Sequence, residues 1–155
     1  MSPAAESARD GPARPEEAVL LHHGLGGRFH RARSAPAVRW LARHDEPGVV
    51  AVCRVSQMGA LRILTHPAPM KDEVKSASEF WEGWERLMGD ERFALTGEPA
   101  GLENVWRALT AALPKGKPAE TDCYLAAFAI AGRHSLVSFD RGLRRFAGLE
   151  LTTPT

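Results

Sequence analysis

The stretch AETDCYLAAFAIAGRHSLVSFDRGLRRFAGLELTT, residues 119–153, decides the fold. Small and apolar residues over 119–134 predict a helix, and SLVSFD at 135–140 predicts a short strand. RGLRRF at 141–146 then predicts a short helix, and LELTT at 149–153 predicts another strand. Strands that alternate with helices form a mostly parallel sheet with helices on both faces. The sequence therefore predicts the α/β class.

The same alternation extends upstream of this stretch. GVVAVC at 48–53 is a β-branched run typical of a buried strand, and Ser56 is expected to cap a helix over 56–66. Ser34 is expected to cap an earlier helix over 34–45. The remaining elements expected before the C-terminal stretch are a helix at 71–88, a strand at 92–96 and a helix at 102–113.

Length and composition predict one globular domain. The chain has 155 residues and a formal net charge of +1, which argues against a strongly basic nucleic-acid coat and an acidic disordered tail. Cys53 and Cys123 lack CxxC spacing, so they are interpreted as buried thiols in a reducing compartment. Without a signal peptide or a membrane-length apolar run, we expect a cytoplasmic protein with no membrane partner. Residues 1–17 lack apolar periodicity and are expected to form a disordered leader.

Two acidic residues are the candidate chemical groups. Asp122 opens the helix TDCYLAAFAI, and Asp140 ends the strand SLVSFD. The C-terminal ends of parallel strands and the starts of neighbouring helices meet on one edge of the sheet, so both carboxylates are expected there. Such a pair suits Mg²⁺ or Mn²⁺ and would support attack of water on a phosphodiester. Spacing alone leaves a second interpretation open, in which Thr121 or Asp122 and Asp140 are ordinary helix-start residues.

The motifs of these segments resemble a known family. Residues 119–155, with the patterns TD-x-YLAA and L-V-S-x-D-R-x-x-x-R-F, resemble the C-terminal third of PIN-domain ribonucleases, in particular VapC-type toxins of bacterial toxin–antitoxin modules. GVVAVCRVSQMGALRILTHP at 48–67 resembles the middle of that family, so the resemblance covers most of 34–155. It implies a PIN-like three-layer α/β/α sandwich spanning 18–155. It also implies a metal-dependent endoribonuclease that acts as a toxin.

The resemblance also implies a metal site built from acidic residues. Family members bind one or two divalent ions with three or four acids, and Asp122 and Asp140 match two of these positions. Gln57 stands where another family acid is often found, and it offers a neutral carbonyl instead of a charge. The first family acid follows an apolar strand, but here His22 follows the strand that ends at Leu21. A site without that acid holds a hard cation less tightly.

Residues 18–33 are the atypical part of the expected domain. His22 and His23 are adjacent, so on a strand they point to opposite faces and do not easily chelate one ion. The segment is interpreted either as degenerate or as the product of a shifted reading frame, because the family resemblance resumes near Ser34. The protein sequence leaves both interpretations open.

The resemblance and the local charge also suggest partners. Candidate RNA-binding residues lie near the expected site: Arg62, Thr121, Arg141, Arg144 and Arg145. The family implies a homodimer and a cognate antitoxin protein. We therefore expect an endoribonuclease toxin with Asp122, Asp140 and Gln57 in its site and Mg²⁺ or Mn²⁺ as cofactor. The alternative is a catalytically impaired PIN-fold protein that retains antitoxin or RNA binding.

Overall fold

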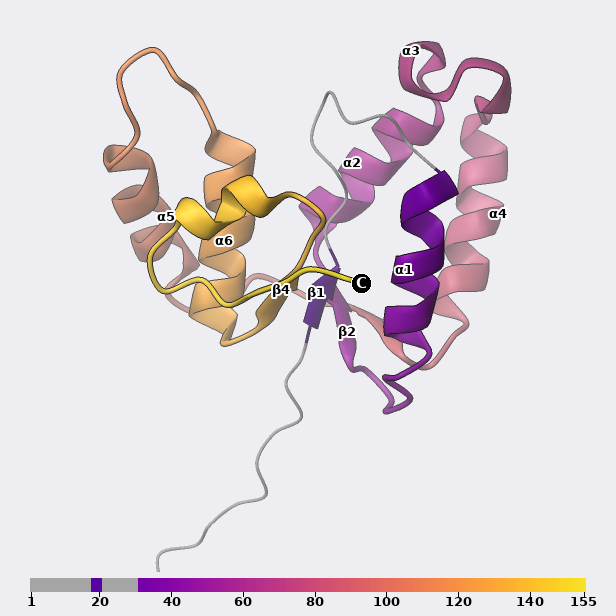
Figure 1. Cartoon of the computed structure of the whole chain (residues 1–155), viewed down its shortest axis with the longest axis horizontal. Helices are drawn as coiled ribbons and strands as arrows, with labels where there is room; N and C mark the ends of the chain where they lie inside the picture. The colour runs from indigo at the N-terminus through magenta and orange to yellow at the C-terminus, as the bar shows by residue number, and fades with distance from the viewer. Residues whose placement is uncertain (1–17, 21–30) are drawn as a thin grey trace, which may run out of the picture.

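The computed structural model describes residues 18–20 and 31–155, and it contains a parallel sheet. The strands are β1 (Ala18–Leu20), β2 (Val50–Val52), β3 (Phe93–Leu95), β4 (Ser135–Val137) and β5 (Leu151–Thr152). Their order in the sheet is β3-β2-β1-β4-β5, and each pair of neighbours is parallel. The predicted α/β class is confirmed. Because β1 lies between β2 and β4, the strands predicted at 48–53 and 135–140 are one strand apart (Figure 1).

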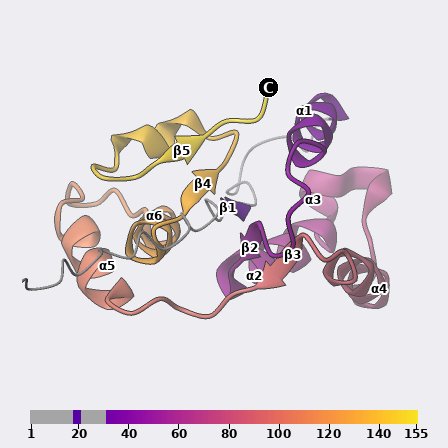
Figure 2. The same cartoon turned by 90° about the horizontal axis from the view of Figure 1, so that it is seen from below.

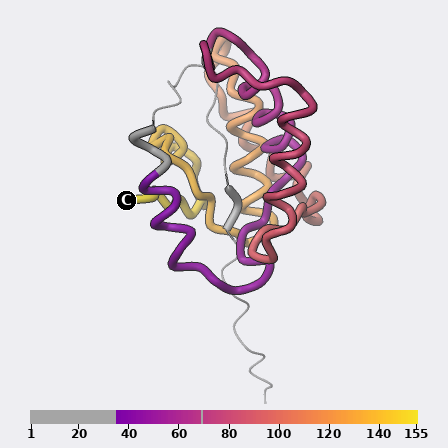
Figure 3. The backbone as a smooth tube through the Cα atoms, turned by 90° about the vertical axis from the view of Figure 1, so that its right-hand side faces the viewer, coloured from indigo at the N-terminus to yellow at the C-terminus, as the bar shows by residue number. Residues whose placement is uncertain are grey.

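Helices connect the strands in the expected alternation. They are α1 (Arg31–Leu41), α2 (Arg54–Leu64), α3 (Pro67–Met70), α4 (Ala77–Met88), α5 (Leu102–Ala111) and α6 (Glu120–Gly132), with short 3-10 helices η1 (Lys71–Glu73) and η2 (Arg141–Arg145). Helices α5 and α6 lie on one side of the sheet in Figure 2, and α1 and α4 lie on the other. Figure 3 views the molecule from the side of α1 and α4. None of the helices in the described segments has the length and apolarity to span a bilayer.

Alternate residues of the strands face two separate cores. Val50, Val52 and Val137 pack with Trp40 of α1 and with the half-buried apolar side chains of α4. Ala51 and Leu136 face the opposite way, toward α6. This alternation is the two-residue period of a strand, and it explains why the strands are apolar on both faces.

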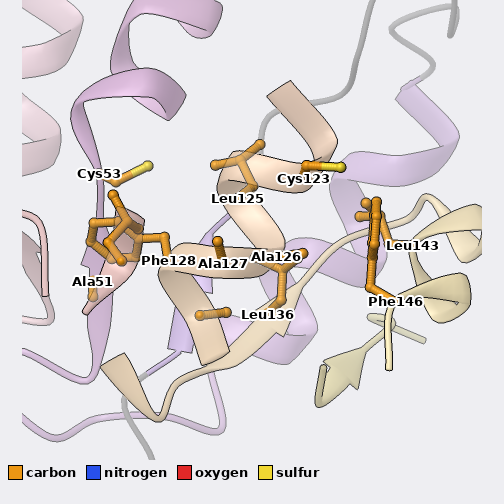
Figure 4. Close-up of a cluster of buried hydrophobic side chains, with 12 residues drawn as sticks. Ala51, Cys53, Cys123, Leu125, Ala126, Ala127, Phe128, Leu136, Leu143 and Phe146 are labelled. Carbon is orange, nitrogen blue, oxygen red and sulfur yellow. The ribbon is translucent and has the colours of Figure 1, made fainter. Parts of the chain in front are cut away.

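Helix α6 is the centre of the larger core. Figure 4 shows its buried side chains between Ala51 and Cys53 on one side and Leu143 and Phe146 on the other. Residues 125–129 of this helix are all buried. The same core therefore packs the end of β2, the helix α6 and the short helix η2 against one another.

Three predicted helix boundaries are wrong. Helix α1 begins at Arg31, so Ser34 lies within it and does not cap it. Helix α2 begins at Arg54 with Cys53 at the N-cap, and the buried Ser56 instead places its hydroxyl 3.3 Å from the Cys53 sulfur. The predicted helix at 71–88 is divided into η1 and α4, because Ser76 starts a new helix with a capping box. The predicted leader at 1–17, together with Leu21, His22 and His23, lies outside the described residues.

Candidate active site

Asp122 lies in the first turn of α6. The helix begins after Ala119, whose side chain provides no cap, so neither Thr121 nor Asp122 acts as the N-cap. The carboxylate of Asp122 instead accepts a hydrogen bond from Arg145, with 2.8 Å between Oδ2 and Nη2. The side chains of Asp122 and Arg145 are 34% and 46% exposed, so solvent reaches this ion pair. A negative charge in the first turn is also favoured by the dipole of α6.

Asp140 lies just beyond β4 and caps η2. Its Oδ1 accepts a hydrogen bond of 2.8 Å from the Gly142 amide, which confirms the capping interpretation for this residue. Its own amide donates to the hydroxyl of the buried Ser138 at 3.0 Å. Because the Ser138 amide donates to the Thr152 carbonyl of the neighbouring strand, the sheet fixes the backbone on which Asp140 lies.

Arg145 connects the two acids. Its Nη2 donates to Asp122, and its Nη1 donates to the Gly142 carbonyl at 3.2 Å, while the Gly142 amide donates to Asp140. The guanidinium also lies over the Phe146 ring, 4.6 Å from its centroid. A Cβ atom at Gly142 would lie 3.0 Å from Asp140 Oδ1 and 3.4 Å from Arg145 Nη1, so glycine permits this close approach. The structure therefore brings Asp122 and Asp140 to one corner.

Gln57 lies in the first turns of α2 and is buried. Its side-chain Oε1 accepts a hydrogen bond from Arg54, and its backbone amide donates to the Cys53 carbonyl at 3.1 Å. Among the described residues, no hydrogen bond joins Gln57 to Asp122 or Asp140. The side-chain carbonyl that could face a cation is therefore already paired with a positive charge.

Comparisons with known proteins found two similar relatives of this chain. The chain is 35% identical over 137 residues to "Ribonuclease VapC41" of Mycobacterium tuberculosis, from strain CDC 1551 / Oshkosh and from strain ATCC 25618 / H37Rv, which covers 86% of this chain and 92% of each relative. The chain belongs to the VapC ribonuclease family. No protein-family model matches it.

A solved structure shares the fold of this VapC-family chain. It is the crystal structure of VapBC2 from Rickettsia felis bound to a DNA fragment from their promoter. The TM-score is 0.60 at 14% sequence identity, and the match covers 89% of this chain and 99% of that chain. At this identity the likeness shows the fold alone.

The other predicted site residues of this VapC-family chain are exposed. Arg141 and Arg144 lie on η2 beside Arg145, and within the part of the chain that the structure describes neither makes an ion pair. Thr121 precedes Asp122 on α6.

Arg62 lies in the last turn of α2, eight residues beyond Arg54, so the two are about 12 Å apart along the helix axis. Arg145 is thus the predicted RNA-binding residue that the structure places directly on an acid.

Sequence reasoning missed two further polar contacts near the start of α6. The Tyr124 hydroxyl donates to Glu98 Oε1 at 2.8 Å, and Trp106 donates to the Glu120 carbonyl at 3.2 Å. Burial, followed by the hydrogen bond to Glu98, raises the pKa of Tyr124. Glu98 follows β3 on the same edge of the sheet as Asp140, and this position was the available signal.

The buried thiol beside Asp122 is not a candidate nucleophile. Cys123 is fully buried, and this burial raises the pKa of its thiol above the usual value. Arg145 acts in the opposite direction as the second cause. A neutral buried thiol is a weak nucleophile.

The residues at the corner fit a divalent cation with few protein ligands. Among the described residues, no group of three or more His, Cys, Asp or Glu side chains is close enough to hold a metal ion. Each acid has one oxygen, Oδ1 of Asp122 and Oδ2 of Asp140, that accepts no hydrogen bond from the described residues. Mg²⁺ commonly uses one or two carboxylates and completes its shell with water and substrate phosphates. The pair therefore suits a weak Mg²⁺ or Mn²⁺ site.

Proposed function

We propose that this chain is a metal-dependent endoribonuclease and the toxin of a toxin–antitoxin pair, with a PIN-like three-layer α/β/α domain over 18–155. One observation carries the assignment of the site. Asp122 and Asp140 come from separate elements and meet through Arg145 and Gly142 at the C-terminal edge of the sheet. Family membership supplies the reaction class, because the curated relatives are ribonucleases.

Asp122 and Asp140 would hold the cation, Mg²⁺ or Mn²⁺. Such an ion, when bound, activates water and neutralises charge on a phosphate. The exposed guanidinium groups of Arg141 and Arg144 are free to contact the RNA backbone beside the acids, and Thr121 lies next to Asp122. Arg62 would contact RNA farther from the acids. The Ser138 hydroxyl, which accepts from the Asp140 backbone amide at 3.0 Å, would help to position Asp140.

A second candidate function is supported by Gln57. Its neutral carbonyl accepts from Arg54, so this part of the site contributes no negative charge. A site with fewer anionic ligands binds hard cations more weakly. The alternative is therefore a catalytically impaired PIN-fold protein that still binds RNA or an antitoxin.

The proposed partners are RNA, a VapB-type antitoxin and a second copy of the chain. The solved structure with the same fold is of VapBC2, which supports an antitoxin partner. A few large apolar side chains are exposed on the helices: Val38 on α1 is 64% exposed, Met58 on α2 62% and Trp81 on α4 44%.

The Asp122→Asn variant tests the proposed function. We expect RNA cleavage in Mn²⁺ or Mg²⁺ to fall by about 100-fold or more, because a ligand worth several kcal/mol of charge stabilisation is lost. The folded state should lose no more than about 1 kcal/mol, since the Asp122–Arg145 pair is partly exposed. Circular dichroism melting checks the fold.

Glu120→Gln is the matched control. It removes the same charge from the same turn of α6 but leaves the Asp122–Arg145 pair intact, so cleavage should stay near the wild-type rate. Cleavage that survives Asp122→Asn, or that continues in excess EDTA, would refute the metal-dependent nuclease. RNA retention in a mobility-shift assay without any cleavage by the wild-type chain would support the impaired alternative.

A further inference from the structure

Arg145 is held by three groups at once. Its guanidinium donates to Asp122 at 2.8 Å and to the Gly142 carbonyl at 3.2 Å, and it lies 4.6 Å from the centroid of the Phe146 ring. Phe146 is itself buried in the core that α6 shares with η2. A side chain fixed by three contacts has a defined position even where it is partly exposed.

The charge of this corner depends on Arg145. Asp122 and Asp140 contribute two negative charges, and Arg145 offsets one of them at direct contact. The corner therefore has less net negative charge than its two carboxylates alone would give.

Arg145 also forms a hydrogen bond to an Asp122 oxygen that a cation could bind. Oδ2 of Asp122 accepts from Arg145, so a divalent ion on Asp122 must bind Oδ1 or displace the guanidinium. An ion on Oδ1 lies a few ångströms from the guanidinium, and the two positive charges repel each other. An ion on Oδ2 first requires the contact between Arg145 and Asp122 to break. Carboxylate oxygens that form charge-assisted hydrogen bonds are also poorer ligands, because part of their charge is already neutralised.

We propose that Arg145 is a positioning residue that holds Asp122 in place of a cation and thereby keeps the divalent-cation affinity of this site low. This inference rests on the metal-dependent function proposed above, and it adds the residue that sets the affinity. It predicts that loss of the positive charge at position 145 strengthens metal binding, whereas a purely structural arginine predicts weaker binding when Asp122 loses its anchor.

The test is a titration of the full-length chain with Mn²⁺ alone, followed by the loss of the electron paramagnetic resonance signal of free Mn²⁺. Arg145→Gln should bind Mn²⁺ about tenfold more tightly than the wild type, from the repulsion of like charges near a protein surface. Arg145→Lys retains the positive charge but not the guanidinium geometry, so its affinity should stay closer to the wild type than that of Arg145→Gln. Melting curves confirm that each variant is folded.

Two further variants make the result specific. Arg107→Gln also removes an exposed guanidinium from an ion pair, the one with Glu103 at 2.6 Å, but on α5, and it should leave the affinity unchanged. Arg145→Met retains aliphatic packing over Phe146 and should show the same gain as Arg145→Gln, so it replaces that variant if glutamine disturbs folding.

The possible outcomes distinguish a failure of the role of Arg145 from a failure of the proposed metal-dependent function. Equal or weaker Mn²⁺ binding by the folded neutral variants, beside measurable binding by the wild type, refutes the role of Arg145 and leaves the metal site standing. The absence of Mn²⁺ binding by the wild type and all variants refutes both the inference and the metal-dependent function.

Discussion

Gly132 ends α6 at a corner with almost no spare space. A Cβ atom there would lie 2.5 Å from both Cδ2 and Nε2 of His134, well inside van der Waals contact. The His134 ring is buried and stacks on Phe128, with 6.0 Å between ring centroids. Arg133 between them has a positive φ of 55°, so the chain turns sharply from α6 into β4. We therefore expect Gly132→Ala to destabilise the protein.

Two opposing effects set the size of this change. Forcing a methyl group against a buried ring typically costs about 1–3 kcal/mol. Replacing glycine by alanine at a helix position recovers up to about 1 kcal/mol. The net loss should be about 1–2 kcal/mol, which for a chain of this size lowers the melting temperature by roughly 2–8 °C.

Gly83 in the middle of α4 is the matched control. A Cβ atom there would meet only the end of the Arg86 side chain, at 3.8 Å. Gly83→Ala should therefore gain up to about 1 kcal/mol and raise the melting temperature. Thermal unfolding followed by circular dichroism measures both variants.

A second substitution tests whether the His134 ring causes the destabilisation expected for Gly132→Ala. In a His134→Ala background the space beside Gly132 is free, so adding Gly132→Ala should no longer destabilise the protein. The packing argument is refuted if Gly132→Ala and Gly83→Ala raise the melting temperature alike, or if the loss at Gly132 is the same with and without the ring.

Two predictions concern local contacts away from the site. The Arg92 guanidinium, followed by its backbone amide, donates to Asp90 and lowers the pKa of that carboxyl from 3.8 to about 2. The ionised carboxylate therefore stabilises the fold above about pH 4, and this effect is lost as the pH falls toward 2. In Asp90→Asn, the urea concentration at the midpoint of unfolding should therefore decrease less between about pH 4 and pH 2 than in the wild type. Ser76→Ala removes the hydroxyl that accepts from the Glu79 amide and should cost about 1 kcal/mol in thermal melts, whereas Ser78→Ala in the same helix should change stability by less than about 0.5 kcal/mol.

The C-terminal stretch was predictable because its structure is decided locally. The apolar run of α6, the short buried strand β4 and the capping of η2 by Asp140 each follow from neighbouring residues. The helix starts were harder, since several serines could cap them. At Ser56 the hydroxyl meets the Cys53 sulfur, and at Ser76 it forms a capping box, a difference that depends on burial.

The contacts of the site were less predictable than its acids. Asp122 and Asp140 could be placed on one edge from strand and helix order, but the partner of Asp122 lies 23 residues away on another element. The sequence therefore predicts Arg145 as an RNA-binding residue, from its charge and its place near Asp140. The Arg54–Gln57 contact is three residues apart on a helix and was in principle visible in the sequence, because such residues are neighbours on the helix surface.

The spacing of the two acids follows from the geometry of the elements between them. From Asp122 to Gly132 the helix descends ten residues, or about 15 Å. From Ser135 to Asp140 the chain returns by at most about 17 Å in extended form. Because the two lengths are similar, Asp140 lies at about the same height along α6 as Asp122. Arg145 then donates both to Asp122 and to the carbonyl of Gly142, two residues after Asp140. One residue fewer in α6 would turn Asp122 by about 100° and move it away from Arg145. The tight corner at Gly132 connects α6 to β4. It therefore helps to set the position of Asp140 relative to Asp122, although it lies at the opposite end of the helix.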